Sequence, residues 1–210
     1  MSCSDQNKNE MGIFDKLLGK QKVAKTIKSI PSSESEQDSK ELMDEDRFWK
    51  LIETAKSSSQ GNYDKQQVDL NNELNQIDAI DILKFDNRFR TYRGNAYKWE
   101  LWGAAYIMNG GCSDDCFSDF RGWLISRGKD AYFNAMSNPE TLVTLNHDME
   151  NDDWEGFSYV PMTAYEQKTG SQMPKGIKEN FEITGEEWEE DGDDLENKYP
   201  NLWQKWDSNN

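Results

Sequence analysis

The chain has few cysteines, and this shortage excludes a disulfide framework. Three cysteines among 210 residues are an odd number. Cys112 and Cys116 form a C-x₃-C pair, but a structural zinc site needs four ligands, and only Cys3 and a single histidine remain. We therefore expect no metal site. We also expect no disulfide between Cys112 and Cys116, because cytosolic thiols are normally reduced.

Long apolar runs are also missing. No stretch of about 20 apolar residues occurs, so we expect no membrane-spanning helix. The N-terminus has neither the apolar core nor the small-residue cleavage site of a signal peptide, and we therefore expect none. These absences lead us to interpret the protein as cytoplasmic. Met11 is an alternative to Met1 as the translation start.

Recognisable catalytic motifs are absent. The sequence contains no G-x-S-x-G, H-E-x-x-H, P-loop or G-x-G-x-x-G pattern. The only histidine, His147, stands in a polar acidic loop, and we interpret it as a surface residue. The acidic clusters at 148–155 and 186–196 lack the alternating ligands of a calcium-binding loop. We therefore predict no catalytic residue and no cofactor.

Positive charge is scarce. Lysine and arginine number 24 against 40 acidic residues, and the formal net charge is −16. Residues 1–42 are balanced, so residues 43–210 carry the whole excess. Such a chain repels the phosphates of nucleic acid, which excludes a nucleic-acid binder. It attracts a basic protein instead. The alternative interpretation is that the charge only keeps the protein soluble.

Aromatic residues, by contrast, are plentiful. They make up 12% of the chain, with eight tryptophans, while the hydrophobic share is only 35%. We therefore expect a folded part beside a part that does not fold. The predicted flexible tail covers 1–42, with a basic amphipathic segment at 11–30 and a polar linker at 31–42; the domain covers 43–210. Segment 11–30 is open to several interpretations: contact with an anionic membrane surface, docking on a partner or on its own domain, or a frayed segment.

Helical spacing of apolar residues dominates the domain. Strand-like alternation is absent, so the predicted fold is all-α, a single multi-helix bundle. Trp99 and Trp102 are expected in the core, on a helix that ends at the glycine pair 110–111. The pattern dissolves from Ser171 to Asp194. The expected helical segments are 44–58, 66–76, 77–93, 95–109, 113–127, 129–137, 138–146, 161–169 and a last short helix within 197–206.

The unusual stretch "MNGGCSDDCFSDF" is explained as the start of a helix. Ser113 is the predicted N-cap, and Asp114 and Asp115 follow in the first turn, where carboxylates complement the helix dipole. Cys112 and Phe117 occupy the two positions that pack as a hydrophobic staple. No chemistry is needed to account for these residue types.

Five residues on this helix form the candidate functional surface. Trp123 is flanked by Arg121 and Arg127, and exposed tryptophan and arginine are frequent anchors of binding surfaces. Asp114 and Asp115 complete the set and, with either arginine, supply an alternative acidic enzyme pocket if the side chains converge. We favour the interpretation that Trp123 packs against a neighbouring helix while the arginines pair with aspartates of their own helix.

Three stretches carry a family resemblance. "MDEDRFWKLIETA", "YKWELWGAAYIMNGGCSDDCFSDFRGWLISRGKDAY" and "YEQKTG" resemble the bacterial domain of unknown function 4240 family over about Met43 to Gly170. The resemblance implies an intracellular, mostly helical domain of unassigned activity. It also implies glycine at the position of Cys116, which further disfavours a metal or disulfide there. The matching positions, which bring no catalytic role with them, are Trp102, Gly110, Gly111, Cys112, Ser113, Asp114, Asp115, Arg121, Trp123, Arg127 and Gly128.

The function predicted from these observations is binding. We expect a non-catalytic intracellular protein-binding module that neutralises a basic partner by charge complementarity, as an immunity protein does. Two alternatives stay open: an enzyme with an acidic pocket around Asp114 and Asp115, and a membrane-surface adaptor that uses residues 11–30.

Overall fold

The computed structural model describes residues 40–147, 155–189 and 194–206. The chain divides into two units, 1–32 and 33–210, and every described residue belongs to the second. The predictions made for the tail, including its basic segment at 11–30, therefore lie outside the described residues.

The described part of the chain is helical, as predicted. Helices account for 71% of these residues, and they contain no β-strand, only one isolated bridge between Lys98 and Thr184. The all-α prediction is thereby confirmed. The elements are α2 (Glu45–Ser59), α3 (Tyr63–Gln76), α4 (Ala79–Asn95), α5 (Trp99–Met108), α6 (Asp114–Ser126), α7 (Lys129–Ser137), the 3₁₀ helices η2 (Pro139–Thr144) and η3 (Gly156–Tyr159), α8 (Val160–Thr169), α9 (Asp194–Lys198) and α10 (Pro200–Trp206).

Local residue chemistry sets the helix ends. Asp44 accepts a hydrogen bond from the backbone N–H of Arg47 and so caps α2, while Ser113 caps α6 in the same way through Cys116 N–H. Both caps were predicted. Gly170 ends α8 in the left-handed conformation at φ +72°, which glycine adopts without steric cost.

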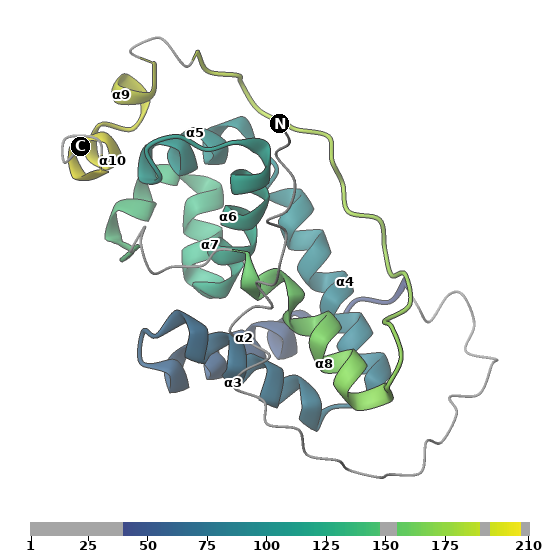
Figure 1. Cartoon of the computed structure of the whole chain (residues 1–210). Helices are drawn as coiled ribbons and strands as arrows, with labels where there is room; N and C mark the ends of the chain where they lie inside the picture. Colours follow the sequence, from purple (N-terminus) through teal and green to yellow (C-terminus); the bar gives the residue numbers. More distant parts are fainter. Residues whose placement is uncertain (1–39, 148–154, 190–193, 207–210) are drawn as a thin grey trace, which may run out of the picture. The chain divides into compact units, whose positions relative to one another are not determined.

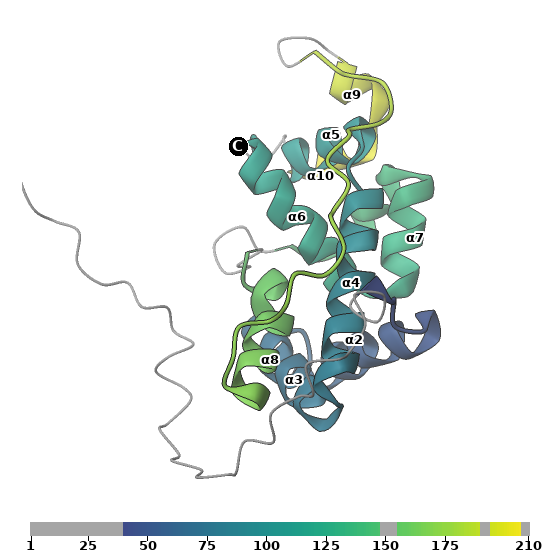
Figure 2. The ribbon, with the colours of Figure 1, turned by 90° about the vertical axis from the view of Figure 1, so that its right-hand side faces the viewer.

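Helix α4 connects two groups of helices. It contacts α2 and α8 on one side and α6 on the other. In Figures 1 and 2, α2, α3 and α8 surround one part of α4, whereas α5, α6 and α7 lie toward its other end. The C-terminal helix α10 packs on α5 and η2, so it closes the second group.

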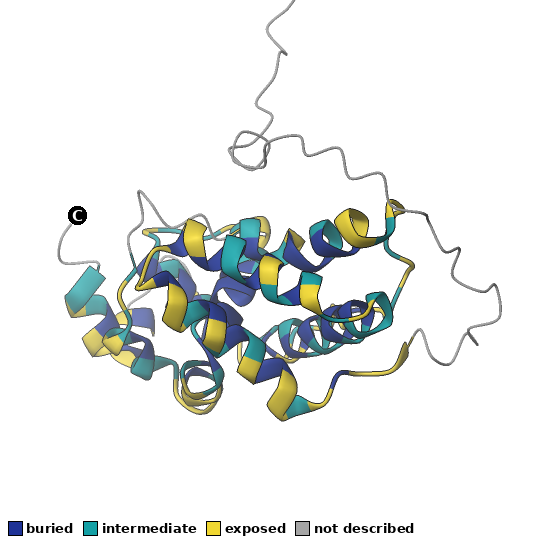
Figure 3. Cartoon of the chain, turned by 90° about the horizontal axis from the view of Figure 1, so that it is seen from below, coloured by how far each residue is buried: buried dark blue, intermediate teal, exposed yellow. Residues whose placement is uncertain are grey.

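The core lies between these helices and is rich in aromatic side chains. Figure 3 shows buried residues on the inward faces of the helices and exposed residues on their outer faces. Each large apolar side chain removed from water contributes about 1.5–3 kcal/mol. No helix in the described ranges has the length and apolar character needed to cross a membrane. The largest fully buried side chains include Phe48, Phe85, Phe89, Phe117, Phe120, Trp123, Tyr132 and Phe157.

Residues 171–189 form an extended segment, here called the C-terminal arm. It runs from α8 toward α9 beside α4 and α5 (Figures 1 and 2). The Ile177 N–H donates to the Asn87 side-chain oxygen at 2.9 Å. Further along, Thr184 exchanges backbone hydrogen bonds with Tyr97 and Trp99. The arm thus forms hydrogen bonds with the segments that it passes in place of helical ones. Its non-helical backbone agrees with the loss of apolar periodicity after Ser171.

Candidate functional site

The two predicted aspartates lie in the first turn of α6. Asp114 and Asp115 directly follow the Ser113 cap, and both are exposed. In this position their carboxylates complement the helix dipole, which is the structural role expected from the sequence.

Arg121 lies in the interior instead. It is 2% exposed, and its guanidinium donates to a carboxylate oxygen of Glu179 at 3.3 Å and to the backbone oxygen of Arg93 at 2.9 Å. It also lies over the ring of Tyr97, 4.6 Å from the centroid. Burial lowers the pKa of Arg121, and the charge of Glu179 offsets this effect. Arg121 therefore forms an ion pair with Glu179 of the C-terminal arm, and the charge of Asp119 on its own helix also raises its pKa.

Trp123 and Arg127 also face inward. Trp123 is fully buried, in agreement with the favoured interpretation. Arg127 donates to the side-chain oxygen of Gln66 and stacks over the Tyr63 ring at 5.0 Å. The predicted set thus separates into two exposed aspartates at the start of α6 and three side chains engaged in packing further along.

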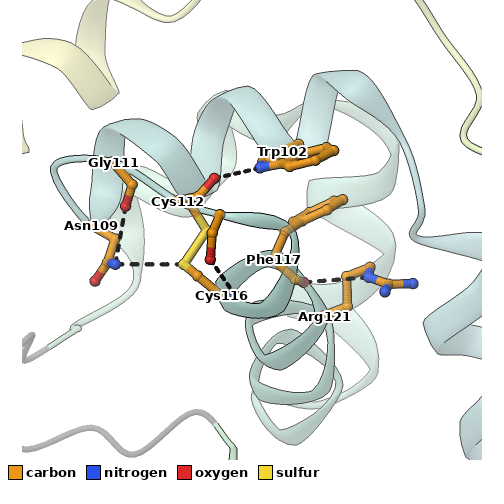
Figure 4. Close-up of a disulfide and its surroundings, with 8 residues drawn as sticks. Trp102, Asn109, Gly111, Cys112, Cys116, Phe117 and Arg121 are labelled. Atoms are coloured by element: carbon orange, nitrogen blue, oxygen red, sulfur yellow. Dashed lines mark hydrogen bonds between the residues drawn. A yellow bond between two sulfur atoms is a disulfide. The ribbon is translucent and has the colours of Figure 1, made fainter.

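Cys112 and Cys116 are joined by a disulfide (Figure 4). The expectation that these residues would not pair is therefore wrong for this structure. The physical reason is the turn around the Ser113 cap, which brings the two Cα atoms to 5.3 Å, well within the range for a disulfide. The expectation of free thiols came from the proposed cytosolic compartment, whereas the distance between the two cysteines depends only on the local geometry of the chain. Both cysteines are half-buried.

An aromatic stack lies beside this disulfide. Trp102 is sandwiched between Trp99 and Phe117, with ring centroids at 5.2 and 5.0 Å and interplanar angles of 10° in both pairs. The Trp102 indole N–H donates to the Cys112 backbone oxygen at 2.8 Å (Figure 4). Phe117 is buried and both tryptophans are half-buried; Trp102 packs against the hydrophobic core, as the sequence predicted.

The C-terminal arm extends the aromatic cluster. The Trp188 indole N–H donates to the Trp99 backbone oxygen at 3.1 Å, and the Trp188 ring meets the rings of Trp99 and Tyr106 at 6.3 and 5.0 Å. Glu100 anchors the arm here by accepting the N–H of Glu186.

Exposed carboxylates lie close to the aromatic cluster in the sequence. Those at the start of α6 follow Cys112, and those of the arm flank Trp188. Two basic residues are also close to the cluster in the sequence: Lys98 precedes Trp99, and Lys198 ends α9. We call the whole the acidic aromatic surface. It consists of Trp99, Trp102, Tyr106, Trp188, Asp114, Asp115, Glu186, Glu187 and Glu189.

His147 differs from its predicted surface role. It is half-buried, and its ring makes an edge contact with Trp123 at 5.5 Å between centroids. Within 40–147, 155–189 and 194–206, no three His, Cys, Asp or Glu side chains are grouped as metal ligands would be.

Sequence reasoning missed two features of this region. Glu179 is one acidic residue in a stretch without periodicity, and nothing local marks it as the partner of Arg121, 58 positions earlier in the chain. The partial exposure of Trp99 and Trp102 was missed because α5 is apolar over most of its surface and its outer face cannot be told from the pattern.

The comparisons with known proteins identify a family. Neither the curated proteins nor the solved structures contain a match to the chain. The family model described as "Protein of unknown function (DUF4240)" matches residues 43–167. This span covers more than half of the chain and includes α5, α6 and the paired cysteines, as the resemblance of those segments predicted. The chain therefore belongs to the DUF4240 family.

Proposed function

We propose that this domain is a non-catalytic binding module that captures a basic protein on its acidic aromatic surface, neutralising it as an immunity protein does. The observation that carries the proposal is the partly exposed stack of Trp99 and Trp102, with exposed carboxylates close to it in the sequence. Tryptophan supplies large apolar contact area at binding hot spots. Carboxylates around it speed the encounter with a cationic partner and disfavour acidic ones.

The distribution of charge supports the same proposal. The net charge of −16 belongs to residues 43–210, since residues 1–42 are balanced. Two arginines that might have offset it, Arg121 and Arg127, are engaged with Glu179 and Gln66. The carboxylates of the surface therefore face a partner without those cations beside them.

The enzyme alternative gains no support from the geometry of the described residues. It required Asp114 and Asp115 to converge with Arg121 or Arg127, but the aspartates are exposed and Arg121 is buried against Glu179. The membrane alternative depends on residues 11–30, outside the described ranges. We propose the cytoplasm as the compartment, which fractionation of the source cells tests.

The proposal is tested by pull-down and charge reversal. The full chain, immobilised at low salt, is expected to recover a basic protein from its source cells, with affinity that falls as salt rises. The double variant Glu186→Lys/Glu187→Lys is then expected to weaken binding of that protein about tenfold, mainly through slower association. Surface plasmon resonance measures both rates.

A matched control separates this surface from net charge. The double variant Glu73→Lys/Glu166→Lys makes the same charge change on α3 and α8. It is expected to weaken binding much less. Equal weakening by both variants contradicts the proposed surface, and failure to recover any basic protein at low salt contradicts the proposed function.

A further inference from the structure

The Cys112–Cys116 disulfide is poorly suited to be a structural staple. It closes a loop with a sequence separation of only four residues, and short loops remove little entropy from the unfolded chain. It joins the loop before α6 to the first turn of α6, and the helices on either side of this loop are already anchored in the core by fully buried side chains, Met108 at the end of α5 and Phe117 in α6. The fold therefore does not depend on this bond for its framework.

The disulfide is flanked by exposed residues. Both cysteines are half-buried, and the residues between them, Ser113, Asp114 and Asp115, are exposed. Accessible disulfides are the ones that exchange with thiols, whereas structural disulfides in secreted proteins resist reduction. In the proposed compartment, a disulfide is usually transient, either catalytic or redox-sensing.

The Cys116 sulfur accepts a hydrogen bond from a side-chain amide. The Asn109 side-chain amide donates to Cys116 Sγ at 3.5 Å and to the Gly111 backbone oxygen at 3.1 Å, which fixes its orientation (Figure 4). Cys116 also lies in the first turn of α6, where unpaired N–H groups favour negative charge. The carboxylates of Asp114 and Asp115 in the same turn act in the opposite sense. Asn109 is thus the group that singles out Cys116 as the better leaving sulfur.

We propose that Cys112–Cys116 is a redox-active disulfide that exchanges with a dithiol reductant and thereby controls the acidic aromatic surface. A thiolate of the reductant attacks Cys112 Sγ, the S–S bond breaks, and its electron pair goes to Cys116 Sγ, which then takes up a proton. The second thiolate of the reductant then attacks the reductant sulfur of the mixed disulfide. This releases Cys112 Sγ as a thiolate, which takes up a proton. The protein gains two electrons and two protons, and the reductant leaves as a disulfide.

The control of the surface follows from one hydrogen bond. The backbone oxygen of Cys112 accepts the indole N–H of Trp102, whose ring is the middle of the aromatic stack. Reduction releases the covalent restraint on the Cys112 backbone and therefore changes the hydrogen bond between the Cys112 carbonyl and the Trp102 indole. This part of the inference rests on the proposed binding surface, whereas the exchange reaction rests on the proposed compartment and on the geometry of the disulfide.

The exchange is tested on the full chain without a partner. A Cys3→Ser variant removes the third cysteine, and dithiothreitol is added without denaturant. Alkylation and mass spectrometry are expected to show two modified cysteines in protein whose circular dichroism is unchanged, and oxidised glutathione is expected to restore the disulfide. Reduction that occurs only after unfolding, or cysteines that stay as thiols in oxidised glutathione, overturns the proposal.

Asn109 is a positioning residue in this scheme. Asn109→Ala is expected to slow reduction by dithiothreitol about fivefold, the effect of one lost hydrogen bond. The control Asn72→Ala, on the exposed face of α3, is expected to leave the rate unchanged. Equal rates in all three proteins overturn the role of Asn109.

The effect on the surface has its own readout. The indole ¹H–¹⁵N signal of Trp102, assigned by its loss in Trp102→Phe, is expected to shift on reduction, while that of the core residue Trp123 stays in place. An unchanged Trp102 signal overturns the control of the surface. Because neither measurement uses a partner, failure of the pull-down and failure of the redox proposal are distinguishable.

Discussion

At the scale of single residues, one buried carboxylate holds the C-terminal arm. The Glu179 side chain is 2% exposed and accepts hydrogen bonds from both Arg93 and Arg121. Taking these charges out of water is costly, and their mutual attraction repays the cost only while all three are present. The cluster therefore acts as a specific attachment between the arm and helices α4 and α6.

Removal of Glu179 is expected to be severely destabilising. Glu179→Ala leaves the buried Arg121 without its counter-charge, so we expect a loss of about 3–5 kcal/mol in the free energy of unfolding. Urea denaturation measures it. The control Glu182→Ala changes an exposed carboxylate three residues further along and is expected to cost less than about 0.5 kcal/mol. Similar losses in both variants would refute the role of the buried cluster.

Asp86 makes stability depend on pH. Burial raises the pKa of Asp86, and Arg90 opposes this only in part. The folded state therefore binds the proton more tightly than the unfolded state, whose aspartate pKa is about 3.9. Between these two pKa values, stability falls as pH rises. This contribution is present below the unfolded value and is lost as pH rises through the folded one.

Comparison with Asp86→Asn isolates this contribution. The unfolding free energy of the native protein minus that of the variant is expected to decrease from about pH 4 upward, until Asp86 is ionised in the folded state. Urea titrations over a pH series measure the difference. A difference that is flat or rises with pH is inconsistent with a raised pKa.

At the scale of elements, helix α6 depends on its cap. Ser113 Oγ accepts the N–H of Cys116 at 3.3 Å, and the exposed aspartates of the first turn add to the same helix terminus. The disulfide constrains this turn as well. The contribution of the cap is therefore best measured where the disulfide cannot form.

Ser113→Ala is expected to cost about 1 kcal/mol of stability on a Cys112→Ala/Cys116→Ala background. Chemical denaturation of the matched pair gives the value. Ser57→Ala, at an exposed interior position of α2, serves as the control and is expected to be neutral or slightly stabilising. Equal effects at the two serines would argue against the cap.

At the scale of the whole molecule, the folded unit extends beyond the family match. The match ends at residue 167, yet Leu195, Tyr199 and Leu202 are buried in the core and Glu179 neutralises buried charge. The arm and the last two helices are thus part of the same hydrophobic core as the matched region.

A chain truncated after Gly170 is expected to unfold at a lower urea concentration than the full chain and to bind a hydrophobic dye. Each large buried side chain that is lost lowers the free energy of unfolding by about 1.5–3 kcal/mol. The sum over several side chains is a large share of the total stability of a domain. Fluorescence of the dye and of tryptophan follows both effects against the full chain. An unchanged midpoint without dye binding would mean that residues 43–170 fold alone.

The sequence by itself determined the helical elements, because their signals are local. The caps at Asp44 and Ser113 and the glycine that ends α8 act within one turn, and apolar spacing marks the buried faces. The burial of Trp123 was also within reach of the sequence, since large aromatic residues on a helix are mostly buried.

Only the tertiary structure decided the partners of the candidate residues. Arg121 pairs with Glu179 of the arm, a residue 58 positions later in the chain. The pairing of Cys112 with Cys116 required a distance that spacing alone does not provide. The exposure of Trp99 and Trp102 depended on which neighbours cover α5. Ion pairing and burial depend on positions in space, which residues distant in the chain determine together.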